Sequence, residues 1–159
     1  MKRVGFALLM LATLGATGST DAPLELQSLD GAPVELGPPQ ADAVFVLHFW
    51  ASWCPTCLAE LATLDEVAVA CSGTPVRVVA VNAGEDAETV TAFLARQPLR
   101  LSVLLDPKAR TFRRLAGREM PANAIWSAAE RHIEPGPRGL AAWRTRLAEL
   151  GCRAEPNSN

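Results

Sequence analysis

The sequence lacks the features that mark several large functional classes. Its net charge is only −2, and no cluster of Lys and Arg offsets that balance, which argues against a nucleic-acid partner. No nucleotide-binding, flavin-binding or metal-binding motif is visible, so we expect no cofactor. The chain also shows no internal repeat and no low-complexity segment. With 49% hydrophobic and 20% charged residues, the composition favours one globular domain with a conventional core.

No apolar run reaches the roughly 20 residues that a membrane span needs. An apolar run over residues 4–14 follows the basic residues Lys2 and Arg3, and this order is typical of a secretory signal. We predict a signal peptide over residues 1–18, with an uncleaved N-terminal anchor as the alternative. Either interpretation places a domain over 19–153 and a loose polar tail over 154–159 in the periplasm. Four cysteines suit such a disulfide-permitting compartment.

Apolar periodicity predicts alternating strands and helices. Alternating apolar residues on both sides of Asp30-Gly31 predict a hairpin over 24–36. The other predicted strands are 44–50, 76–82, 101–105, 122–126 and 131–134, and the predicted helices are 54–70, 87–96, 108–115 and 140–150. This order predicts an α/β fold in which a mixed central sheet carries helices on both faces.

A pair of cysteines, Cys54 and Cys57, stands where the buried strand 44–50 passes into a helix. A cysteine at a helix N-terminus faces unpaired backbone N–H groups and the positive end of the helix dipole, and both stabilise the thiolate. Pro55 suits the first helical turn because its missing N–H would have no helical partner there. The thiolate is the form that attacks disulfides. We predict Cys54 as the nucleophile and the more buried Cys57 as the resolving thiol.

Zinc binding is the alternative for such a pair, but it normally needs a second pair of ligands at suitable spacing. Cys71 and Cys152 are single and distant, and neither His48 nor His132 is paired with them, so we expect no metal site. Cys71 and Cys152 each follow a predicted helix. In an oxidising space we predict a structural disulfide between them, with two free buried thiols as the alternative.

With the redox motif placed on this order of elements, the chain resembles the thioredoxin superfamily. It is most similar to the exported TlpA-like branch, which includes the DsbE-type thioredoxins of cytochrome c maturation. The likeness covers about residues 24–150 and lies in Phe49-Trp50-Ala51-Ser52-Trp53-Cys54-Pro55-Thr56-Cys57, in Val78–Asn82, in Val103–Pro107 and in the position of Pro121. The resemblance implies a thioredoxin fold with an N-terminal β-hairpin extension.

The same resemblance implies roles for residues around the cysteines. Pro121 falls where the family has a cis-proline, beside which a substrate segment pairs with the backbone like an added strand. An ordinary loop proline is the alternative. Met120 would lie against the disulfide, and its flexible thioether suits varied partners. The remaining docking positions predicted around the motif are Trp53, Pro55 and Thr56.

Two further residues are candidates for proton transfer. Glu60, one helical turn beyond Cys57, matches an acidic position of the family and could exchange a proton with the Cys57 thiol. The alternative is a first-turn glutamate favoured by the helix dipole. His48 occupies the strand position where thioredoxin carries a buried aspartate, so it could accept the Cys57 proton. A hydrogen-bonded core histidine is the other interpretation.

These observations predict an exported thiol–disulfide oxidoreductase that reduces protein disulfides. The Pro55-Thr56 dipeptide is similar to that of some cytochrome c maturation reductases. The resemblance implies protein thiols and disulfides as partners, apocytochrome c among them, and a membrane-bound thiol reductant as the source of electrons. Two alternatives stay open. One is an oxidase or isomerase that donates disulfides, and the other is a non-catalytic adaptor or metal-delivery module.

Overall fold

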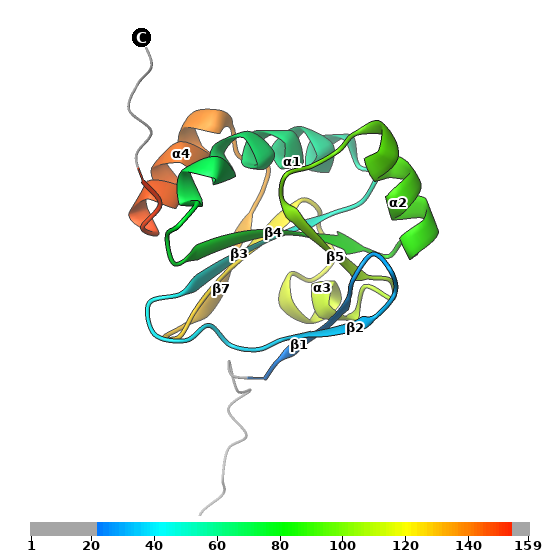
Figure 1. Cartoon of the computed structure of the whole chain (residues 1–159), viewed down its shortest axis with the longest axis horizontal. Coiled ribbons are helices and arrows are strands. Elements are labelled where there is room, and N and C mark those ends of the chain that lie inside the picture. Colours follow the sequence, from blue (N-terminus) through cyan, green and yellow to red (C-terminus); the bar gives the residue numbers. More distant parts are fainter. Residues whose placement is uncertain (1–21, 154–159) are drawn as a thin grey trace, which may run out of the picture.

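The computed structural model describes residues 22–153, which form one sheet covered by helices (Figure 1). The predicted signal peptide, residues 1–18, and the predicted tail, residues 154–159, lie outside the described residues. The strands are β1 (Leu24–Gln27), β2 (Pro33–Leu36), β3 (Val44–Trp50), β4 (Val76–Ala83), β5 (Ser102–Asp106), β6 (Ala122–Ser127) and β7 (Arg131–Pro135). The helices are α1 (Pro55–Val67), the 3-10 turn η1 (Ala68–Cys71), α2 (Ala87–Arg96), α3 (Arg110–Leu115) and α4 (Leu140–Glu149).

Strand β3 lies inside the seven-stranded sheet, whose order is β2-β1-β5-β4-β3-β6-β7. It runs parallel to β4 and antiparallel to β6. A continuous apolar sequence suits a strand that is covered on both faces, and β3 is buried from Val46 to Trp50. The predicted mixed α/β sheet is therefore confirmed.

The N-terminal hairpin forms one edge of this sheet. In it, β1 pairs antiparallel with β2, with Leu24 opposite Leu36, and β1 also reaches β5, with Gln27 opposite Leu105. Gly31 in the turn has a φ of 83°, a conformation that glycine adopts without a steric penalty. The predicted hairpin is thus continuous with the central sheet.

Side-chain alternation along β3 assigns its residues to two faces. Leu47 and Phe49 pack with Phe112 of α3 on one face. Val46 packs with Leu64 of α1 on the other face, which Figure 1 shows covered by α1, α2 and α4. His48, two residues after Val46, therefore lies on the face that carries the Cys54–Cys57 helix.

Several predicted boundaries were wrong by one to three residues. The helix predicted to reach residue 70 ends at Val67 and tightens into η1, while the third parallel strand begins at Ser102 instead of residue 101. Helix α3 begins at Arg110 instead of residue 108. The reason is that the Asp106 carboxylate accepts backbone N–H bonds from Arg110 and Phe112, both at 2.8 Å, and so fixes the first turn at that point.

Candidate active site

Cys54 and Cys57 form a disulfide at the point where β3 passes into α1, with an S–S distance of 2.06 Å. Cys54 is the N-cap residue in an extended conformation, and Pro55 stands at the start of the helix. The Cys57 backbone N–H donates to Cys54 Sγ at 3.3 Å. Cys54 is 6% exposed and Cys57 is fully buried. Cys54 Sγ thus accepts a hydrogen bond from a backbone N–H, and this bond would stabilise the Cys54 thiolate once the disulfide is reduced.

The surroundings of Cys54 are partly apolar and open to solvent. Trp53 is 68% exposed, and Pro55 and Thr56 are exposed as well. Thr56 Oγ1 lies 3.5 Å from Cys54 Sγ. Met120 is half-buried and packs against the cluster that contains both cysteines. The structure therefore brings together, at one surface, residues that the sequence analysis assigned to docking.

The Met120-Pro121 peptide bond is cis, and Pro121 is buried. Its carbonyl oxygen accepts the Gly136 N–H at 3.2 Å, which ties this loop to the segment that follows β7.

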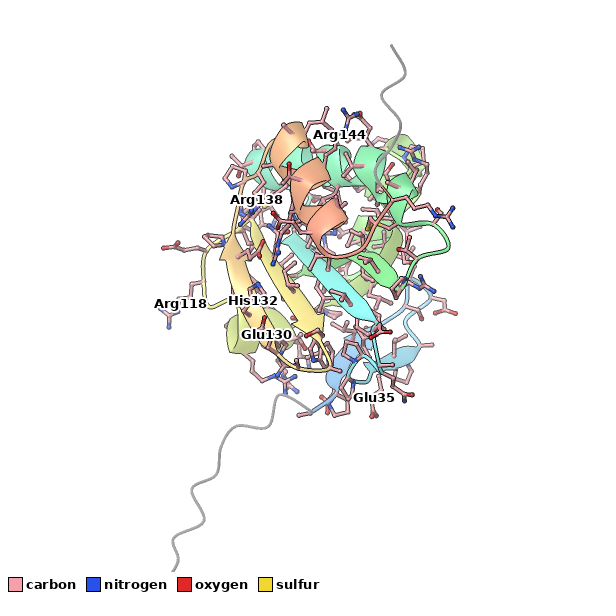
Figure 2. The ribbon with its side chains drawn as sticks, turned by 90° about the vertical axis from the view of Figure 1, so that its left-hand side faces the viewer. Glu35, Arg118, Glu130, His132, Arg138 and Arg144 are labelled. Atoms are coloured by element: carbon pink, nitrogen blue, oxygen red, sulfur yellow. A yellow bond between two sulfur atoms is a disulfide. The ribbon has the colours of Figure 1, made fainter. Side chains whose placement is uncertain are left out.

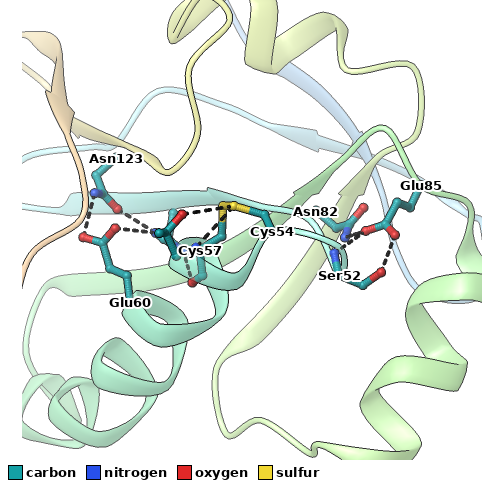
Figure 3. The surroundings of a disulfide bond; sticks show 9 residues. Ser52, Cys54, Cys57, Glu60, Asn82, Glu85 and Asn123 are labelled. Atoms are coloured by element: carbon teal, nitrogen blue, oxygen red, sulfur yellow. Dashed lines mark hydrogen bonds and ion pairs between the residues drawn. A yellow bond between two sulfur atoms is a disulfide. The ribbon is translucent and has the colours of Figure 1, made fainter.

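Glu60 is 1% exposed and lies under the disulfide, not on the outer surface of α1. Its Oε1 accepts three hydrogen bonds: from Trp143 Nε1–H at 2.9 Å, from the Arg138 backbone N–H at 3.0 Å and from Asn123 Nδ2–H at 3.1 Å. Figure 3 shows the contact with Asn123. Its other oxygen, Oε2, is buried without a hydrogen-bond partner. Helix α1 begins at Pro55 and has no acidic residue in its first turn, so the alternative of a first-turn glutamate favoured by the helix dipole does not fit.

His48 is fully buried and contacts Cys57 through the main chain. Its Nε2 lies 3.3 Å from the Cys57 carbonyl oxygen, and its Nδ1 lies 2.9 Å from Asn123 Oδ1. Glu60 Oε2 is 3.9 Å from Nδ1. Burial lowers the pKa of His48 from its usual value of 6.5, although the contacts with Asn123, Glu60 and the Cys57 carbonyl oppose that shift. Burial beneath the disulfide therefore favours the neutral form of this imidazole.

Gly136 allows the segment between β7 and α4 to close over this carboxylate. A Cβ added at Gly136 would collide with Glu60 Oε2 and with Cγ of Pro121. Arg138, whose backbone N–H reaches Glu60, lies where β7 passes into α4 (Figure 2). The sequence analysis assigned no role to residues 135–139, which lie between a predicted strand and a predicted helix. Gly136 stands between Pro135 and Pro137, but nothing in this local sequence indicates its contact with Glu60.

A second polar group fixes the turn that precedes Cys54. The Glu85 carboxylate accepts the Ser52 backbone N–H at 2.7 Å, the Ser52 hydroxyl, and Nδ2–H of Asn82 at 2.6 Å (Figure 3). Because Ser52 is two residues before Cys54, these hydrogen bonds fix the backbone that leads into the N-cap residue of α1. The sequence analysis did not identify Glu85, since nothing local shows that the end of β4 meets the end of β3.

Cys71 and Cys152 are also joined, with an S–S distance of 2.09 Å. They belong to an apolar cluster with Leu64 of α1 and with Trp143 and Leu147 of α4. The bond therefore ties η1 to the segment that follows α4. It leaves no cysteine within residues 22–153 with a free thiol.

Among residues 22–153, no group of three or more His, Cys, Asp or Glu side chains is arranged so that it could hold a metal ion. Within residues 22–153, no helix is both long enough and apolar enough to cross a bilayer.

Comparison with known proteins agrees with this geometry. The Redoxin family model matches residues 16–132. The chain is 30% identical over 94 residues to the thiol–disulfide oxidoreductase ResA of Halalkalibacterium halodurans. That match covers 59% of this chain and 53% of ResA, so the chain aligns with about half the length of this relative.

Solved structures show the same fold. The exposed lipoprotein thioredoxin Etrx1 of Streptococcus pneumoniae is 29% identical with a TM-score of 0.66, over 80% of this chain and 99% of that one. A secreted Mycobacterium tuberculosis disulfide oxidoreductase, homologous to DsbE of E. coli, is 25% identical with a TM-score of 0.66, over 79% and 95% of the two chains. The predicted resemblance to thioredoxin-like proteins of the TlpA and DsbE type is confirmed. The chain belongs to the Redoxin family, within its group of thioredoxin-fold thiol–disulfide oxidoreductases that carry a Cys-x-x-Cys pair.

Proposed function

We propose that the protein is exported to the periplasm and reduces disulfides of other proteins through Cys54 and Cys57. The observation that carries this proposal is the N-cap position of Cys54, whose sulfur accepts the Cys57 N–H at 3.3 Å. Backbone N–H groups at a helix N-terminus lower the pKa of a cysteine and favour its thiolate. The similarity to secreted and surface-exposed oxidoreductases supports the compartment.

The reaction has two exchange steps. The Cys54 thiolate attacks one sulfur of the substrate disulfide, forms a mixed disulfide and releases the other substrate sulfur as a thiolate. Cys57 then loses its proton and attacks Cys54 Sγ. This forms the Cys54–Cys57 bond and releases the second substrate thiolate. The substrate gains two electrons, the protein dithiol loses two, and the released thiolates take up protons.

Substrate docking is assigned to the surface around Cys54. Trp53 offers an exposed aromatic ring, Thr56 Oγ1 lies 3.5 Å from Cys54 Sγ, and Met120 packs against the cluster that contains both cysteines. An extended segment that carries a disulfide suits this surface better than a folded domain, because the Pro121 loop offers main chain for strand-like pairing. Apocytochrome c is such a substrate, by similarity to the DsbE type. A membrane-bound thiol reductant would return the protein to its dithiol state.

A disulfide-donating oxidase is the competing function within the same chemistry. Such an enzyme needs a strongly stabilised Cys54 thiolate, and a positive charge between the cysteines would supply it. The dipeptide here is Pro55-Thr56, and neither residue carries charge. The uncharged dipeptide therefore favours the reductant. A non-catalytic adaptor would have no use for a cysteine at the N-cap.

The reduction potential of the Cys54–Cys57 pair tests the direction. It is measured by equilibrating the protein with glutathione or dithiothreitol buffers and quantifying the free thiols. Variants Cys71→Ala and Cys152→Ala combined keep the second disulfide from contributing. A potential near −270 mV or below supports the reductant, and one near −120 mV supports the oxidase. Insulin reduction, with Cys54→Ala as the control, must proceed; no turnover in either direction would favour the adaptor.

A further inference from the structure

A strongly basic segment runs through α3 and into the loop that follows this helix. Residues 108–118 contain no Asp or Glu and carry five exposed cations: Lys108, Arg110, Arg113, Arg114 and Arg118. These five residues form the α3 basic segment. The sequence analysis saw no basic cluster that offsets the net charge of −2, because it weighed charge over the whole chain, which hides a local excess of one sign.

The α3 basic segment has no counter-charge among residues 22–153. None of its five side chains lies within ion-pair distance of a carboxylate there. Two of them reach main-chain carbonyls instead: Arg113 donates to Lys108 O at 2.6 Å, and Arg114 donates to Pro23 O at 3.3 Å. Exposed arginines elsewhere in the molecule do form ion pairs, at Arg100–Asp65 and Arg144–Glu66. The cations of α3 are therefore available to charged groups outside the chain.

Within α3, three arginines project from one side of the helix. Arg110, Arg113 and Arg114 stand at positions i, i+3 and i+4, which places them within an arc of about 100°. Thr111 and Phe112, the buried residues of α3, point the other way. Like charges at this spacing repel one another. The helix dipole favours Arg113 and Arg114 in the last turn but disfavours Arg110, the first residue of the helix. The arrangement therefore suits a negatively charged partner better than it suits the stability of α3.

The hairpin limits the side from which such a partner can approach. A hollow of about 830 Å³ lies between the hairpin and α3, and Glu25 and Glu35 line it together with Arg110 and Arg114. These two carboxylates would repel an acidic group that entered the hollow. Asp106, which also lines the hollow, has both carboxylate oxygens bound to backbone N–H groups of α3. An acidic partner would therefore lie along the outer side of α3, away from the hairpin.

The C-terminal end of the α3 basic segment reaches the docking surface around Cys54. Arg118 is two residues before Met120, so their Cα atoms are at most about 7 Å apart. Figure 2 shows the Arg118 side chain pointing away from the body of the protein. Met120 packs against the cluster that contains Phe112 of α3 and also against the cluster that contains both cysteines. Glu119, which is exposed, is the first carboxylate after the segment. A polypeptide that lies on α3 can thus continue towards the reactive sulfur.

We propose that the α3 basic segment docks an acidic stretch of the client protein and so selects clients whose disulfide is flanked by Asp and Glu. This assignment rests on the proposed function, because it concerns the substrates of Cys54 and Cys57. Complementary charge raises the rate at which two partners meet and orients them, while the exchange chemistry at Cys54 stays the same. An anionic bilayer is the other surface that such charge suits. Membrane-surface helices also bury apolar side chains, however, and no large apolar side chain of residues 108–118 is exposed.

Exchange rates with charged peptides test the proposal. Reduced protein is mixed with excess peptide whose single cysteine forms a disulfide with a coloured aromatic thiol. Attack by the Cys54 thiolate on the peptide sulfur forms a Cys54–peptide disulfide and releases the coloured thiolate. Three peptides differ only in the residues that flank the cysteine, which are Glu, Gln or Lys. At low salt we expect the Glu peptide to react about tenfold faster than the Gln peptide, the lower end for electrostatic attraction, and the Lys peptide to react more slowly. These differences should disappear in 1 M salt, where the screening length falls to about 3 Å.

Two matched variants separate the α3 basic segment from the overall charge. The first carries Arg110→Gln, Arg113→Gln and Arg114→Gln. The second removes three exposed arginines on other elements, through Arg77→Gln, Arg96→Gln and Arg144→Gln. We expect the preference for the Glu peptide to be lost in the first variant and kept in the second. Arg118→Gln lies outside α3, so it should lower the preference without any effect on the helix. An equal loss in both triple variants would show that only net charge matters and would overturn the proposal.

Two other results would also contradict the proposal, and a third concerns the proposed function. Equal rates with the Glu and Gln peptides in the unmutated protein would refute the docking of acidic clients. Sedimentation with vesicles of phosphatidylglycerol, compared with phosphatidylcholine, tests the bilayer. Binding to phosphatidylglycerol that requires Arg110, Arg113 and Arg114, without a peptide preference, would assign the α3 basic segment to a membrane surface instead. No release of coloured thiolate from any peptide would refute the proposed function.

Discussion

The Cys54–Cys57 and Cys71–Cys152 disulfides are almost equally buried, yet their surroundings differ in kind. The exposed fractions are 6% and 0% for the first pair and 4% and 6% for the second. The first bond spans 3 positions at a helix start, where a backbone N–H points at one sulfur. The second joins cysteines 81 positions apart and lies among apolar side chains, including Trp143. Accessible area therefore does not separate a reactive bond from a structural one, whereas the hydrogen-bond donors around the sulfur do.

Trp143 belongs to both regions. Its ring packs in the apolar cluster around Cys71 and Cys152, while its indole N–H donates to Glu60 beneath the other disulfide. Helix α4 therefore connects the Cys71–Cys152 disulfide to Glu60, which lies under the Cys54–Cys57 disulfide. A substitution of Trp143 itself is therefore expected to affect both regions.

The largest expected effect is the difference in activity between the two pairs. Cys54→Ala should reduce insulin-reduction turnover to the uncatalysed background, because no nucleophile remains. The double variant Cys71→Ala, Cys152→Ala should keep activity within about twofold, since distant sites act independently. A double variant that loses activity while remaining folded by circular dichroism would contradict the separation of roles.

Stability should show the opposite ranking. Removing the Cys71–Cys152 bond releases a loop of 81 positions in the unfolded chain, which costs about 4–5 kcal/mol in the loop-entropy account. Urea unfolding of the double variant against the unmutated protein, both with Cys54–Cys57 oxidised, measures this difference. A loss below about 1 kcal/mol would mean that apolar packing alone holds α4 on α1.

The indole N–H of Trp143 gives a smaller effect. Trp143→Phe removes a donor to a buried carboxylate and should lower the free energy of unfolding by about 1–3 kcal/mol. Trp50→Phe is a matched control, because Trp50 is equally buried and its Nε1 has no acceptor in the structure. Equal losses in the two variants, measured by urea unfolding, would show that only ring volume matters.

The smallest effect concerns pH. Burial lowers the folded-state pKa of His48, so the unfolded chain binds the proton more readily. Stability is therefore complete above the unfolded-state pKa near 6.5 and falls as the pH drops below it, by at most about 1.4 kcal/mol per pH unit. His48→Gln should flatten the unfolding free energy in this window relative to the unmutated protein. His132→Gln is the control, because His132 is half-exposed. If the unfolding free energy of His48→Gln falls more steeply with decreasing pH than that of the unmutated protein, the lowered pKa assigned to His48 is contradicted.

Local sequence patterns were sufficient for the framework of the fold. The continuous apolar run of β3 predicted its bounds, and the start of α1 followed from Pro55 after a cysteine. Both depend on interactions between residues close in the chain. The Cys54–Cys57 pair was predictable for the same reason, because its two cysteines are only three positions apart.

The hydrogen bonds that link Glu60, Asn123 and His48 below the disulfide could not be predicted. His48 and Asn123 are 75 positions apart in the sequence. The contact between Asn123 and His48 follows from the β3–β6 register, and the contact between Trp143 and Glu60 follows from the packing of α4 on α1. Neither can be inferred from local sequence. Gly136 likewise has no local signature of its contact with Glu60 and Pro121. Residues whose role is to satisfy a distant buried group carry no pattern in their own neighbourhood.

Trp53 also offers a way to observe partner binding without a label. Of the four tryptophans, Trp50, Trp126 and Trp143 are at most 1% exposed, whereas Trp53 is 68% exposed beside Cys54. A small dissolved quencher such as acrylamide will therefore extinguish mainly the Trp53 emission. A client protein that settles over the reactive sulfur would shield that one indole, so the loss of quenching can be titrated to give its affinity.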